Sequence, residues 1–379
     1  MVRALKVRKE KGQQAIEWLR NKGWLNTEHR LGKTQQYLII PLNDSARADA
    51  IAEPSAKDAK EFASVLKKFS GKIETKNLQK IKKSSGDLKD KLAKVVPKKY
   101  LSKVNRSFDM VGTIAILDVP KGLEKIEKSI AWTLLRSTPN VKTVAKRASI
   151  TSGKYRIRKI KVLVGDKTTE TIHIENGIRL KLDINEAYFT PRWVTERRRI
   201  ANLVKPRENV LVMFAGVGPF SLAITKLQPK VGKVTSVEIN PAACKYLEEN
   251  IRLNCNIYAA GKASGSSKRA ARAKPAIALM QEKHDVFCGD VAKIVPTLRG
   301  KFDRVLMPLP KTAIEFLELA IKKTKKGGTV HFYTFAGEKE LASLKRKLVK
   351  QYKVRLLRTV ICGAYAPGVD RYCFDLKVL

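Results

Sequence analysis

The sequence has few of the features that would place it in a membrane, outside the cell or around a metal ion. No run of about 18 apolar residues occurs, which argues against a membrane-spanning helix. The N-terminus, MVRALKVRKEKG, lacks the apolar stretch of a signal peptide. Its five cysteines are scattered without a CxxC pair, which argues against a zinc site and against a disulfide framework. We therefore expect a cytoplasmic protein whose chemistry requires no metal ion.

Acidic residues are also scarce, because 35 Asp and Glu stand against 77 Lys and Arg, a formal net charge of +42. Such a field attracts polyanions, and Lys and Arg that neutralise phosphates supply most sequence-independent affinity for nucleic acids. A basic bias of the whole proteome remains open, as does an anionic membrane surface, although no basic amphipathic anchor is evident. The charge favours RNA or DNA as the partner. Coiled-coil heptads are absent, so the default expectation is a monomer.

A chain of 379 residues is long enough for two or three domains, and we predict three segments. Residues 1–75 form a small α/β unit. Residues 76–200 begin with a lysine-rich linking or helical stretch and continue as an α+β domain. Residues 201–379 alternate short apolar strands with helices, which is typical of a doubly wound parallel sheet with a Rossmann-like fold.

Local patterns predict the elements of the first two segments. The run TIHIENGIRLKLDI, residues 171–184, is expected to be a hairpin that turns at Glu175, Asn176 and Gly177. The other expected elements are helices over 11–22 and 122–137 and apolar strands over 37–42, 110–119 and 159–165.

An arginine-rich helix over 196–203 leads into the last segment. There, residues 258–275 are rich in Gly, Ser, Ala and Lys and are interpreted as a flexible surface insertion; contact with RNA phosphates is the less favoured alternative. The remaining expected elements are the strands NVLVMFA, KVTSVEI, DVFCGD, FDRVLM and GGTVHFYTF, helices over 219–227 and 241–254, and an antiparallel pair VRLLRTVIC and RYCFDLKVL.

A glycine-rich turn lies between the strand and the helix of VLVMFAGVGPFSLAI. Gly216 and Gly218 allow the backbone to pass close to a ligand, and the helix N-terminus offers free N–H groups. Such a turn alone is weak evidence, because dinucleotide enzymes share it. Glu238, at the end of the next strand, is placed to accept ribose hydroxyls, and Asp290, after the third strand, to bind an adenine amino group. Together they favour a nucleoside-bearing cofactor.

Two alternatives stay open for this site. Each carboxylate could serve only as a helix cap, and the cofactor could be NAD, although FAGVGPF lacks the third glycine at the usual spacing. The residues expected to bind the cofactor are Phe214, Ala215, Gly216, Gly218, Pro219, Phe220, Glu238, Asn240 and Asp290.

Longer stretches of the sequence resemble the archaeal and eukaryotic tRNA (guanine-37, N1) methyltransferases. The resemblance covers nearly the whole chain except the insertion after Tyr258, and its N-terminal part, ALKVRKEKGQQAIEWL and YLIIPL, is similar to that family's small tRNA-recognition domain. The other matching stretches are SFDMVGTIAIL, the run from ITSGKYRIRK to TPRWVTERRRI, MFAGVGPFS, VEINP, DRVLMPLPK, GGTVHFYTF and AYAP.

The resemblance implies that S-adenosylmethionine is the cofactor and that N1 of guanosine 37, next to the tRNA anticodon, receives the methyl group. It implies that Glu196 is the general base and that Arg156 holds the guanine. The chemistry is coherent, since guanine N1 carries a proton that must leave as the methyl arrives, and an arginine at O6 stabilises the charge that develops. From the residues alone, Glu196 could instead be an ion-pair partner of Arg199 or Arg192, and Arg156 a phosphate contact.

Further residues are expected to bind the tRNA, at its anticodon stem-loop and outer corner. Arg192, Arg197 and Arg198 are assigned to phosphates, because the region 141–207 holds 17 Lys and Arg against 6 Asp and Glu. Tyr188, Pro308, Leu309 and Pro310 complete the expected substrate-binding set.

Two residues depart from the family pattern. Pro308 stands where the family usually has an asparagine that offers an amide to the base, and Val212 stands where an acidic residue commonly opens the cofactor motif. Three interpretations follow: an active divergent member, an enzyme of the wyosine pathway that modifies a changed guanosine or transfers an aminocarboxypropyl group, and a weakened tRNA-binding homologue.

Overall fold

The computed structural model describes residues 2–21, 24–26, 29–43, 66–79, 88–97, 108–119, 122–149, 153–263 and 281–379. It forms two compact units, Met1–Asp87 and Leu88–Leu379, which are described separately. Of the lysine-rich stretch 76–105, the structure describes only residues 76–79 and 88–97, and the latter begin with a short helix, α3 (Leu88–Ala93). Across the described ranges, no helix is long and apolar enough to cross a membrane.

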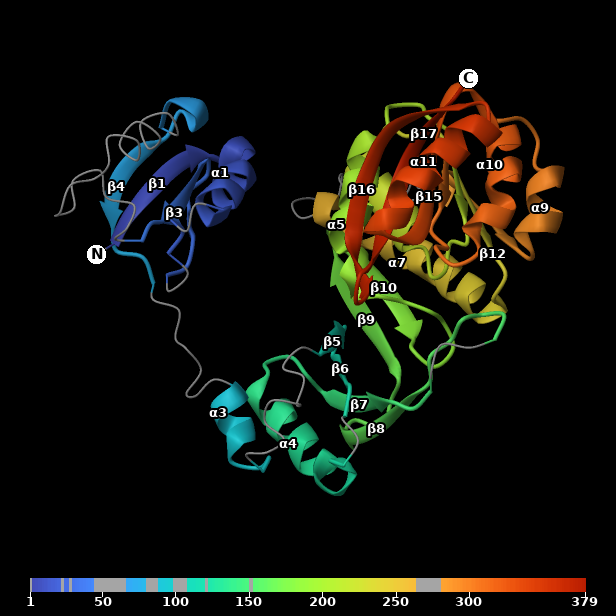
Figure 1. The fold of residues 1–379 in the computed structure, drawn as a ribbon. Helices are drawn as coiled ribbons and strands as arrows, with labels where there is room; N and C mark the ends of the chain where they lie inside the picture. Colours follow the sequence, from blue (N-terminus) through green and yellow to red (C-terminus); the bar gives the residue numbers. More distant parts are fainter. Residues whose placement is uncertain are drawn as a thin grey trace. The chain divides into compact units, whose positions relative to one another are not determined.

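The first unit is a four-stranded antiparallel sheet covered by one helix (Figure 1). The strand order is β2-β3-β1-β4, and β1 pairs with both β3 and β4. Alternation in β1 and an apolar face on the helix bury a small core that includes Leu5, Leu19 and Ile40. The elements are β1 (Val2–Arg8), α1 (Lys9–Asn21), β2 (Gly32–Lys33), β3 (Tyr37–Pro41) and β4 (Lys72–Lys76), so the expected helix and strand are confirmed.

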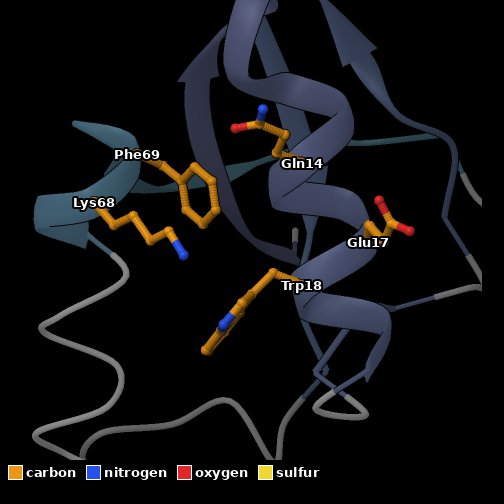
Figure 2. Close-up of a pocket in the computed structure, with 5 residues that line it drawn as sticks. All are labelled: Gln14, Glu17, Trp18, Lys68 and Phe69. Atoms are coloured by element: carbon orange, nitrogen blue, oxygen red, sulfur yellow. The ribbon is translucent and has the colours of Figure 1, made fainter. Parts of the chain in front are cut away.

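A pocket of about 270 Å³ opens beside α1 in this unit (Figure 2). Trp18 of α1 and Phe69 supply its apolar walls, and Gln14, Glu17 and Lys68 supply polar groups at its edge. The Lys68 ammonium lies over the Phe69 ring, 5.7 Å from its centroid.

The second unit begins with a four-stranded sheet of order β5-β6-β7-β8. The single strand expected over 110–119 is wrong: β5 and β6 pair antiparallel around a turn at Gly112 (φ 55°). This turn docks on the following hairpin, because the backbone N–H of Thr113 donates to the Thr171 hydroxyl at 3.0 Å. The elements are β5 (Asp109–Val111), β6 (Ile114–Leu117), η3 (Glu124–Ile126), α4 (Glu127–Ser137), β7 (Thr143–Arg147) and β8 (Ile160–Gly165).

The hairpin expected over 171–184 is confirmed as β9 (Glu170–Glu175) and β10 (Ile178–Asp183). It turns at Asn176 (φ 46°) and Gly177 (φ 77°), the left-handed conformations that a tight hairpin turn requires. The outer edge of β10 is hydrogen-bonded by side chains of helix α7 (Pro241–Ala263). Asn250 accepts from the Lys181 N–H at 2.7 Å and donates to its carbonyl at 2.9 Å, and Asn254 does the same at Arg179.

A seven-stranded sheet of order β13-β12-β11-β14-β15-β17-β16 forms the rest of the unit. The first five strands are parallel, and the last two form the expected antiparallel pair, so the Rossmann-like fold is confirmed. The elements are η4 (Pro191–Trp193), α5 (Val194–Leu203), β11 (Val210–Met213), α6 (Pro219–Leu227), β12 (Val234–Glu238), α7 (Pro241–Ala263), β13 (His284–Cys288), α9 (Val291–Thr297), β14 (Phe302–Met307), η5 (Ala313–Phe316), α10 (Leu317–Lys323), β15 (Thr324–Gly337), α11 (Glu338–Gln351), β16 (Val354–Ala366) and β17 (Val369–Val378).

Helix α7 corrects one expectation from the sequence. It was expected to end at Asn254, with a flexible insertion over 258–275, but it continues to Ala263. The run after Asn254 includes Ala259, Ala260 and Ala263, which favour a helix, and Gly261, which disfavours one. The remainder of the insertion lies outside the described residues.

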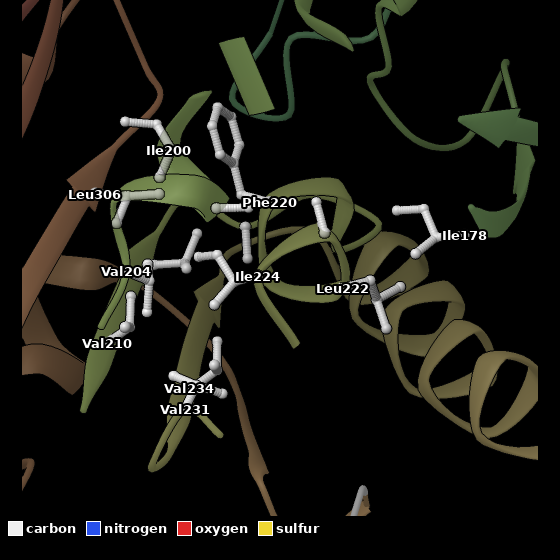
Figure 3. Close-up of a cluster of buried hydrophobic side chains, with 14 of the residues drawn as sticks. Ile178, Ile200, Val204, Val210, Phe220, Leu222, Ile224, Val231, Val234 and Leu306 are labelled. Carbon is white, nitrogen blue, oxygen red and sulfur yellow. The ribbon is translucent and has the colours of Figure 1, made fainter. Parts of the chain in front are cut away.

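One hydrophobic core joins the hairpin to the sheet (Figure 3). Ile178 and Leu180 of β10 are buried with Leu222 of α6, Ile200 of α5 and Val210 of β11. The hairpin therefore packs as part of the Rossmann-like core, although the sequence assigned it to the preceding segment, 76–200.

We predict that Leu180→Ala destabilises this unit by about 2–5 kcal/mol, because it leaves a cavity at a fully buried position. Ile174→Ala on the paired strand is the control: Ile174 is 64% exposed and should change stability by less than about 0.5 kcal/mol. Denaturant unfolding measures both. Equal effects of the two substitutions would contradict the placement of β10 in the core.

Candidate active site

The glycine loop after β11 is built from left-handed backbone positions. Phe214 (φ 61°), Gly216 (φ 56°) and Gly218 (φ 87°) all adopt positive φ, and Gly218 begins α6. A Cβ on Gly218 would lie 2.2 Å from Leu247 of α7, so this glycine is required for packing. A Cβ on Gly216 would meet nothing nearer than the Tyr188 carbonyl oxygen at 3.8 Å. Gly216 therefore borders open space, as a backbone that receives a ligand must.

Glu238 lies beside this loop at the end of the adjacent parallel strand. Its Oε2 accepts the Gly216 N–H at 2.7 Å, and its Oε1 accepts the Asn240 N–H at 2.9 Å. Burial raises the pKa of this carboxyl, and the two backbone N–H groups offset part of that rise. A carboxylate fixed in this way retains lone pairs that can accept hydroxyl groups of a ribose.

Asp290 joins the same edge of the sheet, since the Gly289 N–H donates to the Glu238 carbonyl at 2.7 Å. Its Oδ1 caps α9 by accepting the Ala292 N–H at 2.9 Å, so the helix-cap alternative is part of its role. Both side-chain atoms of Asn240 are bonded within the protein, to the Glu186 carbonyl and to the Ala242 N–H.

The remaining predicted cofactor residues divide between the loop surface and the core. Ala215 is buried, Phe214 and Pro219 are half-buried, and the Phe214 ring packs edge-on against Phe316. Phe220 points into the core, where its ring centroid lies 6.1 Å from that of Tyr333. Their cofactor roles stay predictions. Val212 is fully buried in the hydrophobic core, where a carboxylate would lose its hydration.

Glu196 is buried on α5 and held by two neighbours. Arg199 donates to both of its oxygens, at 2.7 and 2.8 Å, and the Tyr333 hydroxyl donates to Oε1 at 2.6 Å. The ion pair with Arg199 that the sequence allowed is therefore present, whereas Arg192 pairs elsewhere. The Cys362 thiol donates to the Val360 carbonyl at 3.6 Å.

A chain of buried charges continues behind Glu196. Arg199 also holds Asp375 at 2.7 Å, and Asp375 accepts from His331 at 2.6 Å. Burial lowers the pKa of His331 more than Asp375 raises it, so its imidazole is neutral. Its Nε2 lies 2.6 Å from Arg304, which can only donate, so Nδ1 carries the proton that is donated to Asp375. Sequence reasoning missed these residues, whose one signal is a polar side chain within otherwise apolar strands.

His331, Cys373 and Asp375 also have the spacing of a metal site, with ligand atoms within 4.8 Å of one another. Arg304 and Arg199 are hydrogen-bonded to them, and two guanidinium cations repel a further cation. The geometry therefore favours a charge network at this position over a metal centre.

Arg156 reaches the same edge of the sheet from the segment between β7 and β8. Its backbone is left-handed (φ 54°), and its Nη2 donates to the Thr312 hydroxyl at 3.1 Å. Thr312 follows the loop Pro308 to Pro310, which begins at the end of β14, the strand next to β11. All three loop residues are half-buried.

The arginines of α5 and its approach differ in exposure. Arg192 has 61% of its side chain exposed and pairs with Asp109, and Arg198 is exposed and donates to Asn176. Tyr188 is 48% exposed. The phosphate assignment of Arg197 is wrong, because this side chain is buried and paired with the buried Glu175. Residue spacing along the helix could not have shown this burial, because the carboxylate that Arg197 meets, Glu175, lies on another element, β9.

The loop and two carboxylates that suit a nucleoside meet at the carboxyl ends of adjacent parallel strands. Glu196 connects to them through Tyr333 and Phe220. The class of protein defined by this arrangement is a Rossmann-like protein that binds a nucleoside-bearing cofactor.

Three sequence families match the chain in succession. The tRNA methyltransferase 5 N-terminal domain matches residues 4–51, the TYW2 N-terminal domain matches 88–168, and the TRM5/TYW2 methyltransferase domain matches 171–260 and 275–359. The tRNA (guanine(37)-N(1))-methyltransferase Trm5b of Pyrococcus abyssi is 31% identical, over 100% of this chain and 99% of the relative. The chain belongs to the TRM5/TYW2 methyltransferase family.

Solved structures agree with this assignment. A complex of aTrm5 with tRNALeu has a TM-score of 0.63 at 29% identity, covering 99% of both chains. Methanocaldococcus jannaschii Trm5 in complex with adenosine has a TM-score of 0.62 at 28% identity, also covering 99% of both.

A second branch is represented by the tRNA(Phe) (4-demethylwyosine(37)-C(7)) aminocarboxypropyltransferase of Pyrococcus horikoshii, 29% identical over 78% of this chain and 94% of the relative.

We predict that Gly216→Ala weakens binding of S-adenosylmethionine, the cofactor expected from the sequence, because the added methyl group occupies the open side of the loop. Gly300→Ala is the matched control: Gly300 has a similar positive φ (74°) and open surroundings. Both substitutions should cost about 1–2 kcal/mol of stability for the left-handed backbone. Calorimetry should show lower affinity for Gly216→Ala alone; equal affinities would mean that the ligand does not approach Gly216.

Proposed function

We propose that this protein transfers a methyl group from S-adenosylmethionine to N1 of guanosine 37 in tRNA. The observation that carries the proposal is full-length similarity to Trm5b, which includes the N-terminal domain at residues 4–51. The aminocarboxypropyltransferase relative covers only 78% of the chain. The methyltransferase branch therefore accounts for more of the molecule.

The residues at the edge of the sheet fit this cofactor. Glu238 would accept its ribose hydroxyls, Asp290 would bind the adenine amino group, and the backbone at Gly216 would lie against it. The cofactor supplies an electrophilic sulfonium methyl group, so the protein must position the acceptor and remove a proton from it.

Glu196 is suited to remove the guanine N1 proton. A carboxylate has about four acceptor positions, and Arg199 and Tyr333 occupy three of them. This leaves one acceptor position of the carboxylate that a guanine N–H can occupy. Arg199 and Tyr333 keep the carboxylate in one orientation before the substrate arrives.

Arg156 would act at guanine O6 while Glu196 removes the proton from N1. When N1 loses its proton, negative charge develops on guanine O6, and a guanidinium donor at O6 stabilises it. The bond from Arg156 to Thr312 places this side chain beside the loop Pro308 to Pro310, the other expected substrate-binding segment. The tRNA then contacts exposed Arg192 and Arg198 through its phosphates.

Finer assignments complete the proposal. The anticodon stem-loop and the outer corner of the tRNA bind to the protein, which acts as a monomer in the cytoplasm. A reducing compartment suits five free cysteines, of which Cys288 is exposed.

One experiment separates the proposal from its alternatives. The full chain is incubated with labelled S-adenosylmethionine and unmodified tRNA that carries guanosine after the anticodon, and the product nucleoside is identified by mass spectrometry. A methylated guanosine at position 37 supports the proposal. An aminocarboxypropyl adduct on a wyosine precursor would assign the second branch, and binding of tRNA without any product would indicate a weakened homologue.

We predict that Glu196→Gln binds cofactor and tRNA normally but loses about 10²–10⁴-fold in methyl transfer, the usual contribution of a general base. Glu208→Gln is the control, because Glu208 makes the same kind of bidentate pair with an arginine, Arg304, at the far end of the charge chain. Single-turnover kinetics at saturating tRNA measure both. Full activity of Glu196→Gln would remove this residue from the base role.

We also predict that Pro308→Asn raises methyl transfer, because an asparagine amide adds donor and acceptor groups next to the guanine edge. The side chain of Pro308 offers neither. The same single-turnover assay applies, with Pro310→Asn as a control in the same loop. Unchanged rates for Pro308→Asn would mean that the departure at this position is silent.

A further inference from the structure

Arg371 on β17 is buried without a carboxylate partner. Its residue exposure is 9%, and its Nε has no hydrogen-bond partner among the described residues. Its guanidinium carbon lies 4.7 Å from the centroid of the Trp193 ring and 5.5 Å from that of Phe335. The guanidinium thus lies beside two aromatic rings, and its Nε donor is left unused.

The other buried arginines of this unit are neutralised. Arg197 pairs with Glu175, and Arg304 pairs with Glu208. Near Arg371 the strongest cationic influence is a second arginine, Arg192; burial lowers the pKa of Arg371 first, and Arg192 lowers it further. An arginine does not release its proton at neutral pH, and Arg192 is itself paired with Asp109, so Arg371 is the charge that lacks a carboxylate partner among the described residues.

Aromatic contact alone does not account for Arg371. The attraction between a cation and a ring face is smaller than the cost of burying an unpaired charge with an unused donor. A buried guanidinium with open donors is suited to an anion that accepts two parallel hydrogen bonds, and a phosphate has that geometry. The chemistry of Arg371 is therefore suited to an anionic ligand.

The surroundings match one nucleotide of a single-stranded RNA. Strands β16 and β17 form a hairpin at the edge of the large sheet (Figure 1). Arg192 lines a cavity of about 520 Å³ beside the tip of this hairpin. Tyr365 at that tip stacks on Phe335 at 3.9 Å and is 56% exposed, so a base can stack on it. The remaining lining residues are Glu338, Ala364, Ala366, Pro367, Gly368, Val369 and Asp370.

Glu338 and Asp370 place two carboxylates in the same cavity, and these repel phosphate. They accept hydrogen bonds from amino groups of bases. Within the cavity, Arg192 is suited to a phosphate, and Tyr365 and the two carboxylates are suited to a base. Arg371 does not line the cavity itself but lies beside Phe335, the ring on which Tyr365 stacks.

We propose that Arg371, Arg192 and Tyr365 form a subsite for a nucleotide of the RNA substrate, in which the two arginines hold a backbone phosphate and Tyr365 stacks on a base. This proposal rests on the proposed function only for the identity of the RNA as tRNA. Arg371 lies over the Trp193 ring, Trp193 stacks on Tyr333, and Tyr333 donates to Glu196, so the subsite lies next to the proposed base. The nucleotide it binds is therefore close in sequence to the one that is modified.

The test uses the full chain and an unmodified tRNA transcript. Arg371→Met keeps an apolar side chain between the rings and removes the charge. It should weaken tRNA binding about tenfold, the loss expected for a charge-assisted phosphate contact, and lower the slope of log affinity against log salt by about 1. Its melting temperature should equal or exceed that of the parent protein, because an unpaired buried charge is gone.

Tyr365→Leu separates the stacking role from the charge role. It should weaken tRNA binding while leaving the salt slope unchanged, since base stacking releases no counterions. Arg346→Met, at an exposed arginine of α11, controls for the loss of one positive charge and should leave affinity within twofold. Calorimetry with S-adenosylmethionine should give equal affinities for all variants, because none of these residues belongs to the cofactor site.

Opposite results overturn the subsite. If Arg371→Met melts at a lower temperature and binds tRNA with the parent's affinity and salt slope, Arg371 is a structural cation packed on Trp193. Failure of the proposed function is recognised separately, because it appears as absence of methyl transfer by the unmutated chain, whereas the subsite is measured by RNA binding.

Discussion

Arg199 holds two carboxylates at once, Glu196 on its own helix and Asp375 on β17. Burial alone would lower the pKa of this arginine, but the hydrogen bonds to both carboxylates raise it above its usual range. Asp375 shows the converse: burial would raise the pKa of its carboxyl, and His331 and Arg199 hold it well below its usual range. Helix α5 and the C-terminal strands are therefore joined by charges that cannot be separated without leaving one of them buried and unpaired.

These paired buried charges determine the orientation of the Glu196 side chain. A surface glutamate samples many rotamers, but this one is fixed by Arg199 and by Tyr333, whose ring also stacks on Trp193. His331, which is neutral and in a single tautomer, fixes Asp375 in the same way on the far side of Arg199. In the proposed reaction the carboxylate would meet its substrate already oriented, with little reorganisation needed as the proton is transferred.

Local rules predicted much of the fold. Pro219 after a glycine turn located the start of α6, and Asn176-Gly177 located the hairpin turn, because both depend on neighbouring residues. The glycine loop and Glu238 were also predicted to meet, since parallel strands end at one edge. The burial of Arg197 and the charge chain through His331 could not be predicted, because each depends on partners from distant strands. The split at Gly112 likewise depends on docking against β9.

The two asparagines of α7 have a further consequence for how this protein behaves at high concentration. A hairpin with a free outer strand is a template on which another chain can pair, and such edges promote aggregation. Asn250 and Asn254 lie one helical turn apart and use their amides to occupy the edge groups of Lys181 and Arg179. A helix thereby stands in for a third strand, and the hairpin remains two strands wide without inviting β-pairing between molecules.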